Sequence, residues 1–141
     1  MMSGPAASLR VVYHPVMKWE AMYNIDIMLD KLSKSKFRSS FHLSKKMKEY
    51  VCDKGIDVIK SHAYDFVLER LASDNPKNDG KQTPMKGHPV FISQHACACC
   101  CRSCLEKWHH IPKGRKLTQM EVDYIVDLLI RWIMMEVRDE K

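Results

Sequence analysis

Residues 118–133, TQMEVDYIVDLLIRWI, carry the most regular amphipathic pattern of the chain and decide its fold class. Thr118 and Glu121 have the Thr-x-x-Glu spacing of a capping box, in which each side chain bonds the backbone N–H of the other residue. The apolar residues that follow recur at the three- and four-residue intervals of one helix face. These residues are Val122, Ile125, Val126, Leu129, Trp132 and Ile133. The stretch predicts a helix that begins after Thr118 and buries one face.

Three more helices are expected before this one. Apolar residues recur on one stripe from Met17 to Leu32 and stop at the Ser/Lys-rich segment SKSKFRSS. Ser44 is a typical N-cap and Gly55 a typical left-handed residue beyond a helix end, so they bound a short second helix. A continuous apolar stripe over residues 56–72 predicts the third helix.

A long loop separates these helices from the cysteine-rich part. Residues 73–89, SDNPKNDGKQTPMKGHP, contain too many turn formers for a regular element. The pattern then predicts a strand-like PVFISQ (residues 89–94) and one helix over residues 95–109. Because strand signals are too few for a sheet, the sequence predicts an all-α fold, a small bundle of about five helices with a long ordered loop before a Cys/His-rich helix. Residues 17–141 are expected to form this single domain, after a flexible extension of residues 1–16.

Composition and charge indicate where in the cell this domain is expected. The chain has 141 residues, of which 45% are hydrophobic, and a formal net charge of +6. No apolar run approaches the ~18 residues of a membrane span, and the N-terminal segment lacks the apolar core of a secretory signal. We therefore expect a cytoplasmic protein that does not enter membranes. Its oligomeric state is not indicated by the sequence.

The densest chemical feature is QHACACCCRSCLEKWHH, residues 94–110, which holds five of the six cysteines and three of the seven histidines. Since disulfides are rare in reducing cytosol, such a cluster indicates metal binding, catalysis or burial. Zinc sites of the structural kind use four Cys or His ligands in a tetrahedron. The spacing predicts His95, Cys101, Cys104 and His109 as ligands of one structural Zn²⁺. An iron–sulfur cluster fits less well, because the spacing differs from ferredoxin runs.

Two other interpretations of the same cluster remain open. Cys97, Cys101, Cys104 and Trp108 fall at the spacing of one helix face, so the thiols could be ordinary buried side chains of a metal-free interaction module. Alternatively, Cys97 or Cys99 near a helix start could have a lowered pKa and act as a nucleophile or redox sensor.

The long loop supplies candidates for a ligand pocket beside the cluster. They are Asp79, Lys81, Gln82, Thr83, His88 and Cys100. In this alternative the protein is an enzyme, with Cys100 or Cys101 as nucleophile or as ligand of a catalytic metal. The loop could equally be a polar connector.

Basic residues interleave with Phe37, Phe41 and His42 in KSKFRSSFHLSKK, a mixture that can neutralise phosphates and stack bases. A solvated basic face would have the same composition. The candidates for contact with nucleic acid or another anionic partner are Lys34, Lys36, Arg38, Lys45, Lys46, Lys113, Arg115 and Lys116.

From Phe37 to Trp132, and above all in NDGKQTPMKGHPVFISQHACACCCRSCLEKWHHIPKGRKLT, the chain resembles the mostly bacterial family called domain of unknown function 4186. The resemblance implies a small stand-alone protein and no assigned activity. The family pattern has Thr at the positions of Cys97 and Cys99, which weakens a site built on either. The positions of Cys100, Cys101, Cys104, His88, His95 and His109 match that pattern.

The resemblance therefore favours His95, Cys101, Cys104 and His109 as a metal site, with Cys100 as the alternate thiolate. It does not separate a ligand from a core residue. The leading hypothesis is a cytoplasmic helical protein with a structural zinc site that acts as a binding module for nucleic acid. The enzyme and the metal-free interaction module are its alternatives.

Overall fold

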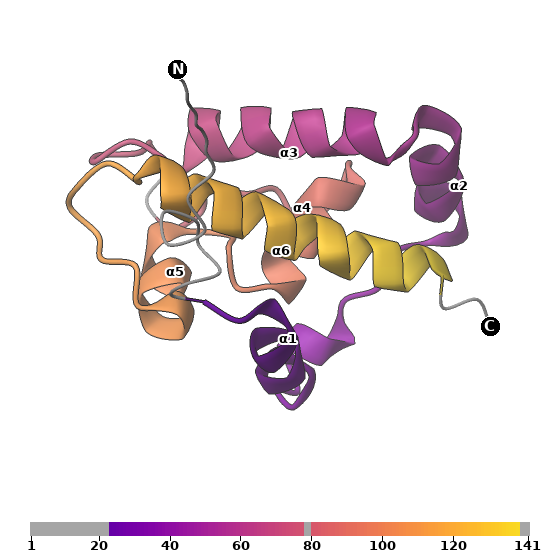
Figure 1. The fold of residues 1–141 in the computed structure, drawn as a ribbon, viewed down its shortest axis with the longest axis horizontal. Helices are drawn as coiled ribbons and strands as arrows, with labels where there is room; N and C mark the ends of the chain where they lie inside the picture. Colours follow the sequence, from indigo (N-terminus) through magenta and orange to yellow (C-terminus); the bar gives the residue numbers. More distant parts are fainter. Residues whose placement is uncertain (1–22, 78–79, 139–141) are drawn as a thin grey trace, which may run out of the picture.

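The computed structural model describes residues 23–77 and 80–138, and within these ranges the chain forms helices and no β-strand (Figure 1). The elements are α1 (Ile25–Ser33), the 3-10 turn η4 (Arg38–Ser40), α2 (Lys45–Lys54), α3 (Ile56–Arg70), α4 (Pro89–Ala96), α5 (Arg102–His109) and α6 (Gln119–Arg138). The predicted all-α class is confirmed. Residues 1–16, predicted as a flexible extension, lie outside the described residues. No described helix has the length and apolar character needed to cross a membrane.

The long helix α6 crosses the middle of the molecule (Figure 1). It packs mainly against α3, which runs antiparallel to it, and against α4. The predicted capping box is present, because Glu121 N donates to Thr118 Oγ1 at 3.1 Å and Thr118 N donates to Glu121 Oε1 at 2.9 Å. Much of α6 is buried, so this helix supplies the centre of the core.

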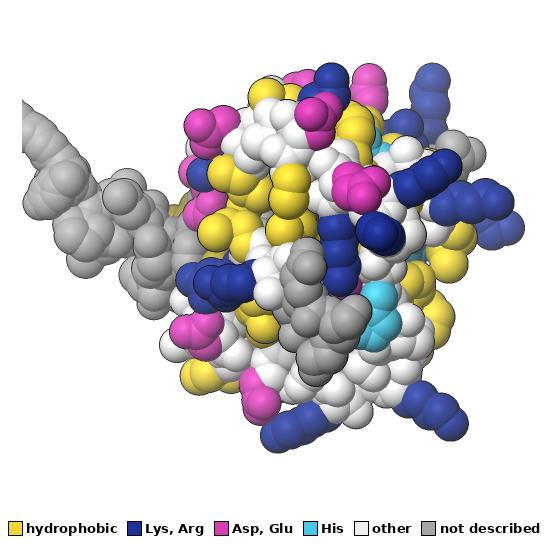
Figure 2. All heavy atoms as spheres, turned by 90° about the vertical axis from the view of Figure 1, so that its right-hand side faces the viewer, with side chains coloured by type: hydrophobic (Ala, Val, Ile, Leu, Met, Phe, Trp, Pro, Cys, Tyr) yellow, Lys and Arg dark blue, Asp and Glu magenta, His cyan; other side chains and the backbone are white. Residues whose placement is uncertain are grey.

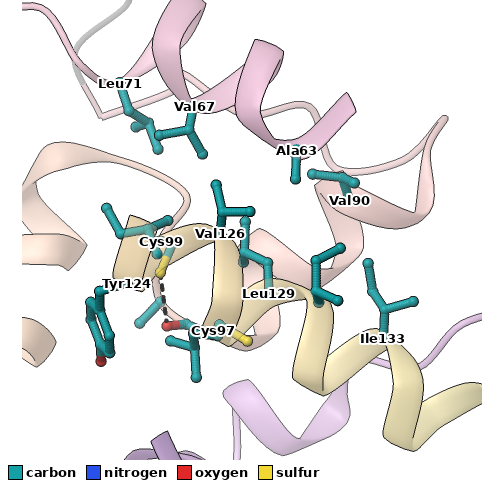
Figure 3. Close-up of a cluster of buried hydrophobic side chains, with 14 of the residues drawn as sticks. Ala63, Val67, Leu71, Val90, Cys97, Cys99, Tyr124, Val126, Leu129 and Ile133 are labelled. Atoms are coloured by element: carbon teal, nitrogen blue, oxygen red, sulfur yellow. Dashed lines mark hydrogen bonds between the residues drawn. The ribbon is translucent and has the colours of Figure 1, made fainter. Parts of the chain in front are cut away.

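The core forms where α3 and α4 cover α6 (Figure 3). Figure 3 shows side chains of α3, of its C-cap Leu71 and of α4 facing those of α6. The labelled residues include Ala63, Val67, Leu71, Val90, Val126, Leu129 and Ile133. Full burial of one Leu, Ile or Val side chain contributes about 1.5–3 kcal/mol. Cys97 and Cys99 lie in the same cluster with no exposed surface. These two thiols behave as small apolar core residues.

Local capping fixes the helices before the long loop. Asn24 Oδ1 accepts from Ile27 N at 3.0 Å at the start of α1, and Ser44 Oγ accepts from Met47 N at 3.2 Å at the start of α2. Gly55 ends α2 with a φ of 91°, a region that glycine enters without steric cost, and α3 begins at the next residue. The predicted second and third helices are confirmed. The predicted helical stripe from Met17 begins outside the described residues, and α1 itself starts at Ile25.

Residues 89–109 differ from the prediction of a strand followed by one continuous helix. PVFISQHA is α4, whose start is fixed by Pro89 in the first turn and by His88 Nδ1, which accepts from Val90 N at 3.0 Å. Every residue of α4 is buried, so its sequence lacks the helical alternation of apolar and polar positions. The helix ends at Ala96, Ala98 has a left-handed φ of 58°, and helical structure resumes only at Arg102. The predicted helix face through Cys97, Cys101, Cys104 and Trp108 therefore does not exist.

Candidate metal centre

Three sulfur atoms meet at the start of α5. The Sγ atoms of Cys100, Cys101 and Cys104 all lie within 4.8 Å of one another. Cys101 is the N-cap of α5, and its Sγ accepts from Cys104 N at 3.4 Å. Cys100 precedes the cap, and its Sγ contacts Cys104 Sγ at 3.6 Å. The three sulfurs thus come from the N-cap of α5, the residue before it and the first turn of the helix.

The irregular segment between α4 and α5 divides the five clustered cysteines into two sets. Cys97 N donates to Ser93 O and Cys99 N to Gln94 O, both at 2.8 Å, and Ala98 between them is left-handed. Cys97 and Cys99 become core residues, whereas Cys100 joins Cys101 and Cys104 in the thiol group. Cys100 and Cys101 are 8% and 7% exposed, and Cys104 is half-buried.

A buried cation lies against this thiol group. Arg38, from η4, is only 8% exposed, and its Nη2 donates to Cys104 Sγ at 3.1 Å. Its Nη1 donates to His95 O at 2.7 Å and lies 3.7 Å from Cys100 Sγ. The Phe37 and Trp108 rings are 5.0 and 5.9 Å from the guanidinium carbon, so two aromatic faces flank the charge. A buried cation needs an anionic or polar partner, and here the two sulfurs and a carbonyl supply it.

The proton affinities of the thiols follow from these contacts. The hydrogen bond between the Cys100 and Cys104 sulfurs, helped by Arg38, lowers the pKa of Cys100 to about 7 although burial opposes it. The same bond, together with burial, raises the pKa of Cys104 well above its usual range. The two thiols share a proton in this hydrogen bond, so the first deprotonation of the pair is easier than that of an isolated cysteine. Burial raises the pKa of Cys101.

A group of three thiols is suited to bind a soft or borderline metal ion. Thiolate sulfur binds zinc at about 2.3 Å, and sulfurs in a tetrahedral site then lie about 3.8 Å apart. Cys100 Sγ and Cys104 Sγ are 3.6 Å apart, near that value, and no two of the three sulfurs are more than 4.8 Å apart. Three thiolates and a divalent ion would carry one net negative charge, which Arg38 offsets. The Cys residues present therefore fit a thiolate metal site with three protein ligands.

His109, one of the predicted ligands, lies inside the core. It is 2% exposed, its Nδ1 is 2.8 Å from Tyr124 Oη, and its Nε2 is 2.9 Å from Cys97 O. A carbonyl oxygen only accepts, so Nε2 carries the hydrogen and Nδ1 accepts from the tyrosine. Burial lowers the pKa of His109 to about 4. Both ring nitrogens thus have hydrogen-bond partners in the core, and Nε2 also lies 3.6 Å from Sγ of Cys99, which is itself a core residue.

His95, the other predicted histidine, is also bonded elsewhere. Its Nε2 lies 3.0 Å from Pro84 O and 3.2 Å from Thr83 O, and its ring stacks on Phe41 at 5.6 Å. Its contribution to the thiol group is its backbone carbonyl, which holds Arg38. The structure brings Cys101 and Cys104 together with Cys100, the alternate thiolate, and leaves both histidine rings on other partners.

Some of the predicted pocket residues lie near the thiol group and others do not. Thr83 Oγ1 donates to Cys100 O at 2.8 Å and accepts from Gln94 Nε2 at 3.2 Å, so the loop holds the backbone of the thiol group. Gln82 is buried, Lys81 is exposed, and Asp79 lies outside the described residues. His88 lies at the other end of α4, where its Nε2 is 3.0 Å from His62 Nδ1.

The predicted nucleic-acid residues do not form one group of free charges. Arg38 is buried against the thiols, Arg115 pairs with Glu121 at 2.7 Å, and Lys34 pairs with Asp30 at 3.2 Å. The other candidates are exposed, namely Lys36, Lys45, Lys46, Lys113 and Lys116. On the face that carries α2, Figure 2 shows Lys and Arg side chains spread over several areas with acidic side chains among them. Binding of nucleic acid stays a prediction.

Sequence reasoning missed the two arginines that organise this region. The basic composition of its segment groups Arg38 with surface charges, and its place between Phe37 and Phe41 is the one local sign of burial. Arg102 is 1% exposed and donates to four carbonyl oxygens, those of Leu71, Ser73, Pro112 and Arg115, at 2.7–3.0 Å. No local pattern indicates this role, because its partners come from separate segments.

Comparison with protein families identifies a family to which the chain is similar. The model of a family described as a domain of unknown function (DUF4186) matches residues 26–134, which include every element from η4 to α5 and most of α1 and α6. No solved structure matches the chain.

Proposed function

The chain belongs to the family described as a domain of unknown function (DUF4186), and from this premise we propose that it is a metal-binding module whose ligands are Cys100, Cys101 and Cys104. The family description assigns no activity, so the proposal depends on the site itself. The observation that carries it is the approach of the three Sγ atoms to within 4.8 Å of one another.

The contrast between the two sets of cysteines supports metal binding over packing. Cys97 and Cys99 are fully buried among apolar side chains, as expected for cysteines that only fill space. Cys100 and Cys104 instead contact the buried guanidinium of Arg38. A cation in this position stabilises sulfur in its anionic form, which is the form that binds metals.

Zinc is the metal that this donor set fits best among common ions, since thiolates select soft and borderline metals. The site differs from the predicted structural one in its ligand count. Three protein ligands are typical of zinc sites that keep a fourth position for water or another molecule, whereas structural sites use four. The proposed centre would therefore have a position open to an external ligand. Arg38, which contacts Cys100 Sγ and Cys104 Sγ, would supply a positive charge outside the ligand set.

Metal analysis of the purified full-length protein tests the proposal. We expect about one equivalent of zinc in the wild type and a loss of zinc in Cys100→Ser, Cys101→Ser and Cys104→Ser. Serine is a good N-cap, so Cys101→Ser retains the start of α5 while it removes a thiolate. Cys52→Ser is the matched control, because Cys52 is exposed on α2 outside the thiol group. Zinc that survives all three substitutions would refute the proposed ligand set.

A further inference from the structure

We propose that reversible formation of a Cys100–Cys104 disulfide, driven by a hydroperoxide, switches the thiol group between a metal-binding and a metal-free state. This inference rests on the proposed function and adds a regulatory role to the same site. It would make metal binding depend on the oxidant level around the protein.

The geometry selects this pair among the three thiols. Cys100 Sγ and Cys104 Sγ are 3.6 Å apart and in direct contact. A disulfide needs a separation of about 2.05 Å, so the sulfurs have to approach by roughly 1.5 Å. Cys100 lies in the irregular segment before α5, so rotation of its side chain breaks no helical hydrogen bond, and its carbonyl can keep the bond from Thr83 Oγ1. Cys104 is half-buried, so a small oxidant has access to one member of the pair.

Cys101 is the least suited of the three to react. Its Sγ is held by Cys104 N at 3.4 Å as the cap of α5, and moving it would leave that N–H without its partner. A Cys100–Cys101 bond would join adjacent residues, whose sulfurs reach one another only with a distorted backbone. Cys100 and Cys104 are also the two thiols of the group whose sulfurs contact Arg38.

The chemistry balances with a hydroperoxide as the oxidant. One thiolate attacks the terminal peroxide oxygen, so an S–O bond forms, the O–O bond breaks, and the leaving hydroxide or alkoxide takes a proton. The second thiolate attacks the resulting sulfenic sulfur, an S–S bond forms, and the S–O bond breaks with loss of hydroxide, which is protonated to water. The two sulfurs together give up two electrons. A small-molecule thiol reverses the step by two successive thiol–disulfide exchanges.

Loss of these two thiolates removes two of the three proposed ligands. Cys101 alone would remain, and a single thiolate does not hold zinc in competition with water and other ligands. Oxidation should thus release the metal, and reduction should restore binding.

The test uses the full-length protein with the Cys52→Ser substitution, which removes the exposed thiol. Zinc-loaded protein is treated with hydrogen peroxide, free thiols are blocked, and the denatured chain is cut with trypsin. Cleavage after Arg102 separates Cys100 from Cys104, so a disulfide between them joins two peptides. We expect this joined pair to appear as zinc is released, and both changes to reverse with dithiothreitol. Release of zinc without the joined peptides, or oxidation that dithiothreitol does not reverse, would overturn the inference.

Variants separate this inference from the proposed function. Cys101→Ser should lose zinc and still form the joined peptides, whereas Cys100→Ser should lose both. If the reduced protein binds no zinc, the proposed function fails, whatever the peptides show. If it binds zinc and Cys101→Ser forms no joined peptides, the inference alone fails.

Discussion

Arg38 Nη2 donates to Cys104 Sγ at 3.1 Å across 66 residues of sequence. This contact ties η4, which precedes the long loop, to the first turn of α5, which follows it. The same guanidinium bonds the carbonyl of His95 at the end of α4. One side chain therefore joins three separate elements at the thiol group and supplies positive charge to the sulfurs.

Removal of that charge should weaken metal binding. In Arg38→Met the thiols lose their cationic partner, so protons compete more strongly with the metal at neutral pH. We expect zinc affinity, measured by competition with a chromophoric chelator, to fall by roughly 10–100-fold, the usual effect of losing a group that supports the ligands. Arg131→Met removes a charge from an exposed pair with Asp26 and is the matched control. Equal affinities in wild type and Arg38→Met would show that Arg38 has only a structural role.

Arg102 should be a strong determinant of stability. Its guanidinium satisfies four carbonyl oxygens from the end of α3 and from the segment between α5 and α6. Arg102→Met leaves these acceptors without donors, and we expect the free energy of unfolding in urea to fall by about 3–5 kcal/mol. Arg102→Lys should recover little of this loss, because an ammonium group lacks the planar fork that reaches carbonyls on two sides. Full rescue by lysine would contradict this explanation.

Acid should destabilise the fold through buried histidines. Burial lowers the pKa of His109 to about 4, and burial with the nearby His62 lowers that of half-buried His88 to about 4. The unfolded chain binds these protons near pH 6.5, so the stability that the neutral rings contribute is complete above that pH and is lost as pH falls toward 4. At pH 5 we expect a loss on the order of 2 kcal/mol from His109 and less from His88.

Two substitutions check the origin of this pH dependence. His109→Gln retains a donor and an acceptor, and His88→Asn retains a helix cap, but neither side chain titrates. Urea denaturation between pH 7 and pH 4.5 should give a flatter stability profile for each variant than for the wild type. A wild-type stability that does not change across this range would contradict the neutral state of both rings in the folded protein.

The sequence was sufficient where structure follows from local signals. The capping box at Thr118, the Ser44 cap and the Gly55 end are each decided within a few residues, and these helices begin or end as predicted. The prediction failed at α4, because a helix buried on all sides has no polar face to reveal its period. A strand was the natural but wrong interpretation of PVFISQ.

The site was harder to predict than the fold because its geometry depends on one backbone reversal. The spacing of Cys101 and Cys104 indicates a thiolate pair, and the structure places these sulfurs together. The choice of His95 and His109 assumed one continuous helix, which Ala98 interrupts with its φ of 58°. The contact between Arg38 and the thiols joins two segments far apart in the sequence, so no local pattern predicts it.

X-ray absorption at the zinc edge of the zinc-loaded protein tests the central claim most directly, because it counts sulfur and nitrogen neighbours separately. The account predicts three sulfurs at about 2.3 Å and one lighter atom at about 2.0–2.2 Å. Two sulfurs with two imidazole nitrogens would contradict it, because that shell requires the His95 and His109 rings to leave their present partners and join Cys101 and Cys104.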